Sequence, residues 1–130
     1  MNRKILVVDD DPGMVRTLCD ILRLRGWEAV GVHSGEAAVR EEGDNSYAFV
    51  LMDIMMPGVD GIAALKAMKS RHPGARIVLM TAHTAEERIA EAIRAGALRV
   101  VHKPIDLASL MALLSQNGGS TLSGDARGGN

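Results

Sequence analysis

The chain alternates between two patterns: short runs rich in apolar residues, and longer segments in which apolar residues return at helical spacing. The runs cover residues 4–8, 29–32, 48–52, 76–80 and 98–102. Such short runs, rich in β-branched residues, are typical of strands covered on both faces. Because a helical segment follows each run, we expect parallel strands in one sheet with helices on both faces.

Local signals also predict where the helices begin and end. Asp11 followed by Pro12 is typical of a helix start, and Gly26 is expected to end that helix. Further helices are expected over residues 34–42, 62–71, 84–96 and 106–116, the third of these from a capping box that begins at Thr84. We therefore predict the α/β class: a flavodoxin-like (βα)5 three-layer sandwich with a parallel five-stranded sheet of order 2-1-3-4-5.

Length and composition fit one globular domain. The 130 residues, 47% of them apolar, suffice for a core. We expect a folded domain over residues 1–117 and a flexible Gly/Ser-rich tail or linker stub over 118–130. The single Cys19 favours a cytoplasmic setting, and no apolar run is long enough for a signal peptide or membrane span. A net charge of −1 argues against direct nucleic-acid binding by this segment.

Polar residues follow four of the apolar runs where each predicted strand ends. Asp9 and Asp10 follow the first run, Asp53 the third, Thr81 the fourth and Lys103 the fifth. In an open parallel sheet, ligands bind beyond the carboxyl ends of the strands. The fold therefore predicts one crevice that holds three carboxylates, a hydroxyl group and an ammonium group.

Carboxylates brought together in this way need compensation. Two unit charges about 4 Å apart repel by roughly 4 kcal/mol at an effective dielectric constant near 20, and Lys103 alone cannot offset three acids. Mg²⁺ suits oxygen ligands with open water positions, and it would also neutralise a phosphoryl group arriving at Asp53. We predict Mg²⁺ as the cofactor and Asp53 as the nucleophile, with Thr81 and Lys103 holding phosphoryl oxygens.

Each of these residues also has an ordinary structural interpretation. Asp11 most simply caps a helix, Thr81 alone would satisfy backbone groups, and Lys103 alone would be a solvated charge. Met55 and Met56 are typical of loop or packing residues. Only the joint occurrence at four strand ends favours a functional site.

Four motifs resemble the response-regulator receiver domain of two-component signalling. They are VVDDDP at the first strand end, VLMDIMMPGVDG around Asp53, LMTAH at Thr81 and VVHKP at Lys103. The resemblance covers residues 3–117, in the family's order and spacing. Within the family, DIMMPGVDG and MTAH most resemble the receivers of multidomain transcription activators.

The resemblance implies a signalling phosphoacceptor rather than an enzyme, one that assists its own phosphorylation and dephosphorylation. Asp53 would accept a phosphoryl group from the phosphohistidine of a sensor histidine kinase. Asp10 and Asp53 would bind Mg²⁺ with the backbone carbonyl of Met55, and Asp9 would contribute through water. The domain would then switch an output or partner surface.

Other positions take roles from the same resemblance. Thr81 would bond a phosphoryl oxygen, Lys103 would pair with the phosphoryl group, and the peptide bond before Pro104 would be cis. The chain departs from the family at Val100, where members commonly carry an aromatic residue that swings inward with the threonine. A valine cannot make that movement, so the usual threonine–aromatic switch is not expected here.

A second departure concerns the lifetime of the acyl phosphate. Met55 and His83, two residues beyond Asp53 and Thr81, flank the path of the hydrolytic water in this family. Met55 is apolar and cannot orient a water molecule, so we predict slow self-dephosphorylation. His83 could titrate near neutral pH and affect the rate, although a solvent-facing loop histidine is the simpler interpretation.

Three other functions fit parts of the pattern. A phosphohydrolase with an aspartyl-phosphate intermediate would need an acid two positions after the nucleophile, where Met55 stands. A flavin-binding module would need a Gly-rich phosphate loop and aromatic residues, which the chain lacks apart from Trp27, Tyr47 and Phe49. A binding module that is never phosphorylated would leave the acidic set unexplained.

For the phosphoacceptor, we expect a readout surface, and a possible homodimer interface, formed by the helix over 85–95, the strand over 98–102 and the last helix.

Overall fold

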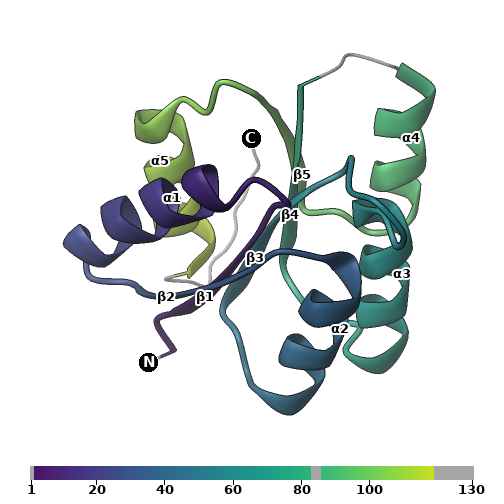
Figure 1. Cartoon of the computed structure of the whole chain (residues 1–130), viewed down its shortest axis with the longest axis horizontal. Helices are drawn as coiled ribbons and strands as arrows, with labels where there is room; N and C mark the ends of the chain where they lie inside the picture. Colours follow the sequence, from purple (N-terminus) through teal and green to yellow (C-terminus); the bar gives the residue numbers. More distant parts are fainter. Residues whose placement is uncertain (1, 83–85, 119–130) are drawn as a thin grey trace.

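The structure, a computed structural model, describes residues 2–82 and 86–118. In this part of the chain five strands alternate with five helices (Figure 1). The strands β1 to β5 are Lys4–Val8, Glu28–Val32, Phe49–Asp53, Ile77–Thr81 and Arg99–His102. The helices α1 to α5 are Pro12–Leu24, Gly35–Asp44, Gly61–Arg71, Glu86–Arg94 and Leu107–Gly118.

The strands form one parallel sheet in the order β2-β1-β3-β4-β5. Helices α1 and α5 cover one face of the sheet, and α2, α3 and α4 cover the other (Figure 1). The predicted α/β class, the flavodoxin-like three-layer architecture and the strand order are therefore confirmed. Within the described ranges, no helix is both long and apolar enough to span a bilayer.

The core is divided by the sheet into two apolar clusters. Along β1, Ile5 and Val7 point into the cluster with α1 and α5, whereas Leu6 and Val8 point into the cluster with α2 and α3. All four side chains are fully buried. A strand buried on both faces must be apolar at every position, which is why residues 5–8 of β1 form a continuous apolar run.

The helix starts follow the capping rules. Asp11 precedes α1, and its Oδ1 accepts hydrogen bonds from the backbone N–H groups of Gly13 and Met14 at 3.0 and 3.3 Å. The structural interpretation of Asp11 is thus confirmed. The Ser34 hydroxyl caps α2, and the Asp60 carboxylate caps α3.

The element boundaries differ from the predicted ones by small amounts. Strands β3 and β4 each include one more residue at the carboxyl end, Asp53 and Thr81, because the backbone ladder continues past the apolar run and pairs Asp53 with Met80. Helix α5 continues past Gln116 to Gly118. The predicted cap Thr84 and the tail from residue 119 onward lie outside the described residues.

Candidate functional site

Strand register brings the predicted site residues to one edge of the sheet. Val8 of β1 pairs with Met52 of β3, so the next residues, Asp9 and Asp53, lie side by side. The backbone N–H of Lys103 donates to the Thr81 carbonyl oxygen over 2.8 Å, which aligns the ends of β4 and β5. The four predicted strand ends therefore converge.

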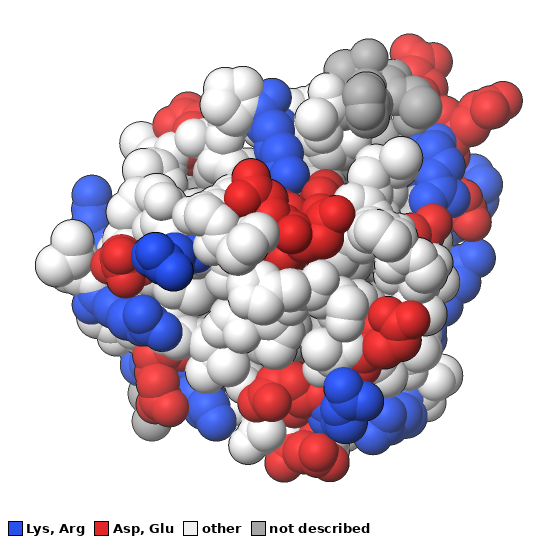
Figure 2. All heavy atoms as spheres, in the orientation of Figure 1, with Lys and Arg blue, Asp and Glu red and all other residues white. Residues whose placement is uncertain are grey.

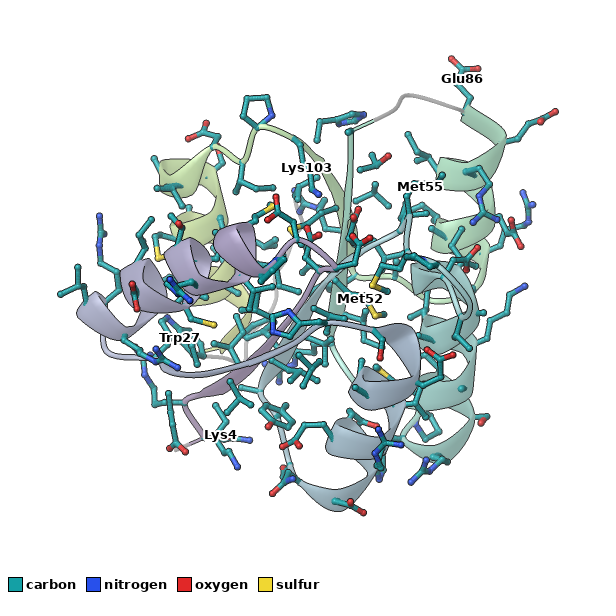
Figure 3. All side chains as sticks on the ribbon, in the orientation of Figure 1. Lys4, Trp27, Met52, Met55, Glu86 and Lys103 are labelled. Atoms are coloured by element: carbon teal, nitrogen blue, oxygen red, sulfur yellow. The ribbon has the colours of Figure 1, made fainter. Side chains whose placement is uncertain are left out.

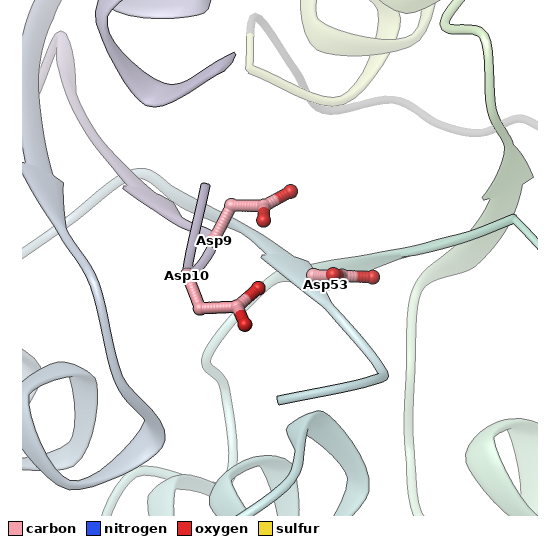
Figure 4. A group of neighbouring side chains, drawn as sticks. All are labelled: Asp9, Asp10 and Asp53. Carbon is pink, nitrogen blue, oxygen red and sulfur yellow. The ribbon is translucent and has the colours of Figure 1, made fainter. Parts of the chain in front are cut away.

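Three carboxylates meet at this edge. One oxygen each of Asp9, Asp10 and Asp53 lies within 4.8 Å of the others. Their side chains approach one another from the ends of β1 and β3 (Figure 4). Asp9 and Asp53 are buried, with 1% and 6% exposure, whereas Asp10 is exposed. Acidic side chains gather near the middle of the face shown in Figure 2, with a basic side chain beside them. The cluster is therefore reached from solvent through Asp10, while the other two acids are largely withdrawn from water.

Lys103 is the cation that joins two of these acids. Its Nζ lies 2.8 Å from Asp9 Oδ2 and 3.3 Å from Asp53 Oδ2. Figure 3 shows Lys103 and Met55 toward the same end of the molecule, away from Lys4 at the start of β1. Burial alone would lower the pKa of Lys103, but the hydrogen bond to Asp9 and the charges of Asp53 and Asp9 outweigh it and raise that pKa. Lys103 therefore stays charged.

Of the two buried acids, Asp53 is less well compensated than Asp9. Burial, and then the negative charge of Asp9, raise the pKa of Asp53, and Lys103 only partly opposes them. Its Oδ1 accepts one long hydrogen bond, 3.4 Å, from the Met55 N–H. Asp9 is better satisfied, because its Oδ1 accepts from the Asp11 N–H at 3.0 Å while its Oδ2 binds Lys103. The ionised Asp53 carboxylate is thus buried with incomplete compensation.

The loop after Asp53 is held close to the strand end. The N–H of Gly61 donates to the Ile54 carbonyl oxygen over 2.8 Å. A Cβ atom at Gly61 would lie 2.3 Å from the Asp53 carbonyl oxygen, so only glycine fits this approach. Gly58 in the same loop has a φ of 74°, in the left-handed region that favours glycine. Met55 is exposed and Met56 is buried in the core, so the two methionines of the loop differ in role.

The remaining predicted positions are found as follows. Thr81 is buried at the end of β4, and the Lys103–Pro104 peptide bond is cis. Val100 lies on β5, partly buried against the cluster with α3. His83 lies outside the described residues. The cis bond is the isomer that the resemblance implies.

Two contacts near the site do not follow from the sequence patterns. His33, in the β2–α2 loop, lies with its Nδ1 3.3 Å from the Asp9 carbonyl oxygen. Asp60, at the end of the loop that follows Asp53, pairs with Arg88 of α4 at 2.6 Å. The capping rule identifies Asp60 as a helix start, but its partner lies 28 residues away, and no local pattern signals that pair.

The arrangement fits a hard divalent cation. The three clustered ligands are carboxylate oxygens, which Mg²⁺ prefers, and the exposed side chain of Asp10 leaves that side open to water. Burial and, second to it, the negative charge of Asp9 raise the pKa of Asp53, and a bound cation would oppose both effects. Residues for holding Mg²⁺ and for bonding an anion beside Lys103 are therefore both present.

Comparisons of this chain with known proteins all indicate the same family. The family model for the response regulator receiver domain matches residues 5–115. The chain is 36% identical over 129 residues to the response regulator protein FleR of Pseudomonas aeruginosa. That alignment covers 99% of this chain and 27% of FleR. The chain is also 39% identical over 105 residues to the chemotaxis protein CheY of Bacillus subtilis, in an alignment that covers 80% of this chain and 88% of CheY.

A solved structure agrees with these sequence relatives. The crystal structure of the CheX–CheY–BeF3–Mg²⁺ complex from Borrelia burgdorferi contains a chain that superposes with a TM-score of 0.80 at 27% identity, covering 87% of each chain. The present chain spans about a quarter of the length of FleR but most of the length of CheY. The matched region contains the five strands, except for Lys4 at the start of β1, and the whole carboxylate cluster. The chain therefore belongs to the family of response-regulator receiver domains of two-component signalling.

Proposed function

We propose that Asp53 accepts a phosphoryl group from the phosphohistidine of a sensor histidine kinase. The observation that carries this proposal is the convergence of Asp9, Asp10, Asp53 and Lys103 at one edge of the sheet. Of the two buried acids, Asp53 has the longer contacts with its partners, and it carries a raised pKa. A buried carboxylate with spare bonding capacity is suited to attack an electrophilic phosphorus atom.

The transfer exchanges one bond for another. An Asp53 oxygen forms a bond to phosphorus while the bond from phosphorus to the kinase imidazole nitrogen breaks, and that nitrogen keeps the electron pair and takes a proton from water. Lys103 pairs with the phosphoryl group, and the Thr81 hydroxyl donates to one of its oxygens. These groups stabilise charge that spreads over the phosphoryl oxygens in the transition state.

We further propose that Asp10 and Asp53 hold Mg²⁺ together with the Met55 carbonyl oxygen, and that Asp9 contributes through water. When bound, Mg²⁺ supplies positive charge that offsets the phosphoryl oxygens and the clustered acids. The mutual proximity of the three acids supports this assignment. The similar chain in the CheX–CheY complex from Borrelia burgdorferi, which contains both BeF3 and Mg²⁺, lends further support.

The proposed output face is formed by α4, β5 and α5. Two large apolar side chains are exposed in this region: Ile93 of α4 at 51% and Leu98, immediately before β5, at 37%. Apolar side chains of this kind are suited to contact a partner, so we propose this face for partner binding and for a homodimer.

The first experiment is labelling with radioactive acetyl phosphate in the presence of Mg²⁺. Wild-type protein should incorporate label, Asp53→Asn should incorporate none, and chelation of Mg²⁺ should abolish incorporation. Asp20→Asn, an isosteric change at an exposed α1 site, is the matched control and should label normally. Label that persists in Asp53→Asn would refute the proposed acceptor, and a wild-type protein that takes up no label would favour a binding module that is never phosphorylated.

A further inference from the structure

Helix α4 buries fewer residues than any other helix in the described part of the chain. Only Ala92 of α4 is buried, whereas α3 buries five residues and α1 four. The apolar Ile93 of α4 is half-exposed. The position of α4 therefore depends more on polar contacts than the position of α3 does.

Those polar contacts are ion pairs between α4 and α3. Arg88 Nη2 lies 2.6 Å from Asp60 Oδ2, and Arg88 Nη1 lies 3.0 Å from Glu91 Oε1. The other oxygen of Glu91 accepts from Lys66 Nζ at 3.2 Å. Two ion pairs therefore cross between the helices, with Arg88 and Glu91 on α4 facing Asp60 at the start of α3 and Lys66 within it.

Asp60 connects this network to the loop that carries the proposed phosphoacceptor. One Asp60 oxygen caps α3 and the other binds Arg88, so the carboxylate is held from two directions. Partial burial acts against its charge, but the backbone hydrogen bonds and Arg88 prevail and lower the pKa of Asp60. The next residue, Gly61, is hydrogen-bonded to Ile54, which follows Asp53 directly. A displacement of this loop would therefore also displace Asp60.

The same helix is connected to the site along the chain. Helix α4 follows β4 after a short connection, and β4 ends at Thr81. A shift of Thr81 toward a phosphoryl oxygen would act on the start of α4, the end that Arg88 holds. Because β5 carries Val100 where a ring would be needed, movement cannot be passed through a rotating aromatic side chain.

We propose that Arg88 is a positioning residue whose ion pair with Asp60 holds the start of α4 beside the loop after Asp53 and opposes the displacement of α4 that accompanies phosphorylation. The inference rests on the proposed function. A contact that stabilises only the undisplaced state reduces the apparent affinity for a phosphoryl analogue, so its removal raises that affinity by the same factor. The two side chains are 38% and 33% exposed, so the expected gain is about two- to fivefold.

Asp60→Asn is the most informative substitution. Asparagine caps helices as well as aspartate does, so it keeps the capping oxygen and removes the charge and the acceptor oxygen that Arg88 binds. Arg88→Gln removes the charge on the other side, and the double variant completes a cycle that isolates the pair. Asp20→Asn, which breaks an exposed ion pair with Arg23 on α1, is the matched control.

The measurement is a BeF3⁻ titration of each Mg²⁺-saturated protein, followed through backbone amide NMR signals of α4. Both single variants should bind about two- to fivefold more tightly than wild type, and the double variant no more tightly than either single variant. Asp20→Asn should bind as wild type does. Before BeF3⁻ is added, the Ile89 and Ala92 signals of the variants should already be displaced toward their bound positions.

The outcomes separate this inference from the proposed function. If wild type binds no BeF3⁻, the proposed phosphoacceptor fails. If wild type binds but the variants bind equally well or more weakly, or if the two effects add in the double variant, the positioning role of Arg88 is overturned. A lower melting temperature with unchanged BeF3⁻ affinity would likewise leave Arg88 with a purely structural role and refute the inference.

Discussion

The centre of the sheet and its β5 edge are packed very differently. All five residues of β3 and all five of β4 are buried, whereas every residue of β5 is partly or fully exposed. The adjacent helices follow the same trend, because α3 buries five residues and α4 only one. The proposed acceptor thus lies at the end of the most deeply buried strands, and the lightly packed elements lie beside it.

This difference assigns two tasks to two regions. Phosphoryl transfer requires groups held in fixed positions, which the buried centre provides. A change of shape after phosphorylation must cost little free energy, and an element with few buried apolar contacts can move at low cost. We infer that the domain changes shape at α4 and β5 because these elements are the ones that the core holds least.

The prediction with the largest expected effect compares two side-chain substitutions, one in α3 and one in α4. Leu65→Ala in α3 deletes a fully buried side chain and should lower the free energy of unfolding by about 2–5 kcal/mol. Ile93→Ala in α4 deletes a half-exposed side chain and should change it by no more than about 0.5 kcal/mol. Urea denaturation of both variants measures the two values. Similar losses would show that α4 is packed as firmly as α3 and would remove the basis of the comparison.

The charge at the centre provides the next test. Asp53→Asn should raise the free energy of unfolding by about 1–2 kcal/mol at neutral pH in metal-free buffer, because it removes a buried and poorly compensated charge. Since the pKa of Asp53 is raised by folding, the destabilisation is fully present above the folded pKa. It disappears as the pH falls through that pKa to the unfolded value of about 3.9.

The pH dependence is the control for this prediction. Urea denaturation of wild type and Asp53→Asn at several pH values should give stabilities that converge as the pH is lowered. Asp20→Asn, at an exposed position, should match wild type at every pH. A difference between wild type and Asp53→Asn that does not depend on pH would mean that packing, and not charge, is responsible.

Mg²⁺ should stabilise the strand ends that carry the carboxylates more than it stabilises α4. At ten times its dissociation constant, Mg²⁺ should stabilise the protein by about 1.4 kcal/mol, and Asp10→Asn should reduce this gain. Hydrogen exchange should slow at the ends of β1 and β3, which carry the carboxylates, and change little in α4. Equal protection of α4 would indicate that the metal site and this helix are coupled before phosphorylation.

The smallest expected effect concerns the exposed Met55. Met55→Asn places an amide two residues after Asp53, where it can orient an attacking water molecule. The loss of acyl phosphate should become about fivefold faster, the factor that corresponds to roughly 1 kcal/mol for one hydrogen bond. The decay of label from the phosphorylated protein measures this rate, with Met55→Leu as the apolar control. An unchanged or slower decay would contradict the predicted role.

Much of the fold could be predicted from local patterns. The apolar runs marked the strands most clearly at β1, β3 and β4, because a strand buried on both faces shows no polar alternation. Asp11 marked the start of α1 because its carboxylate satisfies backbone N–H groups close by in sequence. Strands β3 and β4 each end one residue later than predicted, since the polar Asp53 and Thr81 interrupt the apolar run while the backbone ladder continues. Backbone hydrogen bonding does not depend on side-chain polarity, so hydropathy alone misses such ends.

The grouping of Asp9, Asp10, Asp53 and Lys103 was also within reach of the sequence, because parallel strands direct their carboxyl ends to one edge. By itself, then, the sequence determined the strands, their order and the set of residues at that edge. Only the tertiary structure decided that Lys103 forms ion pairs with both Asp9 and Asp53, and that Arg88 pairs with Asp60 at the start of α3. Local patterns arise from neighbours along the chain, whereas an ion pair between helices depends on the distance at which the two helices pack.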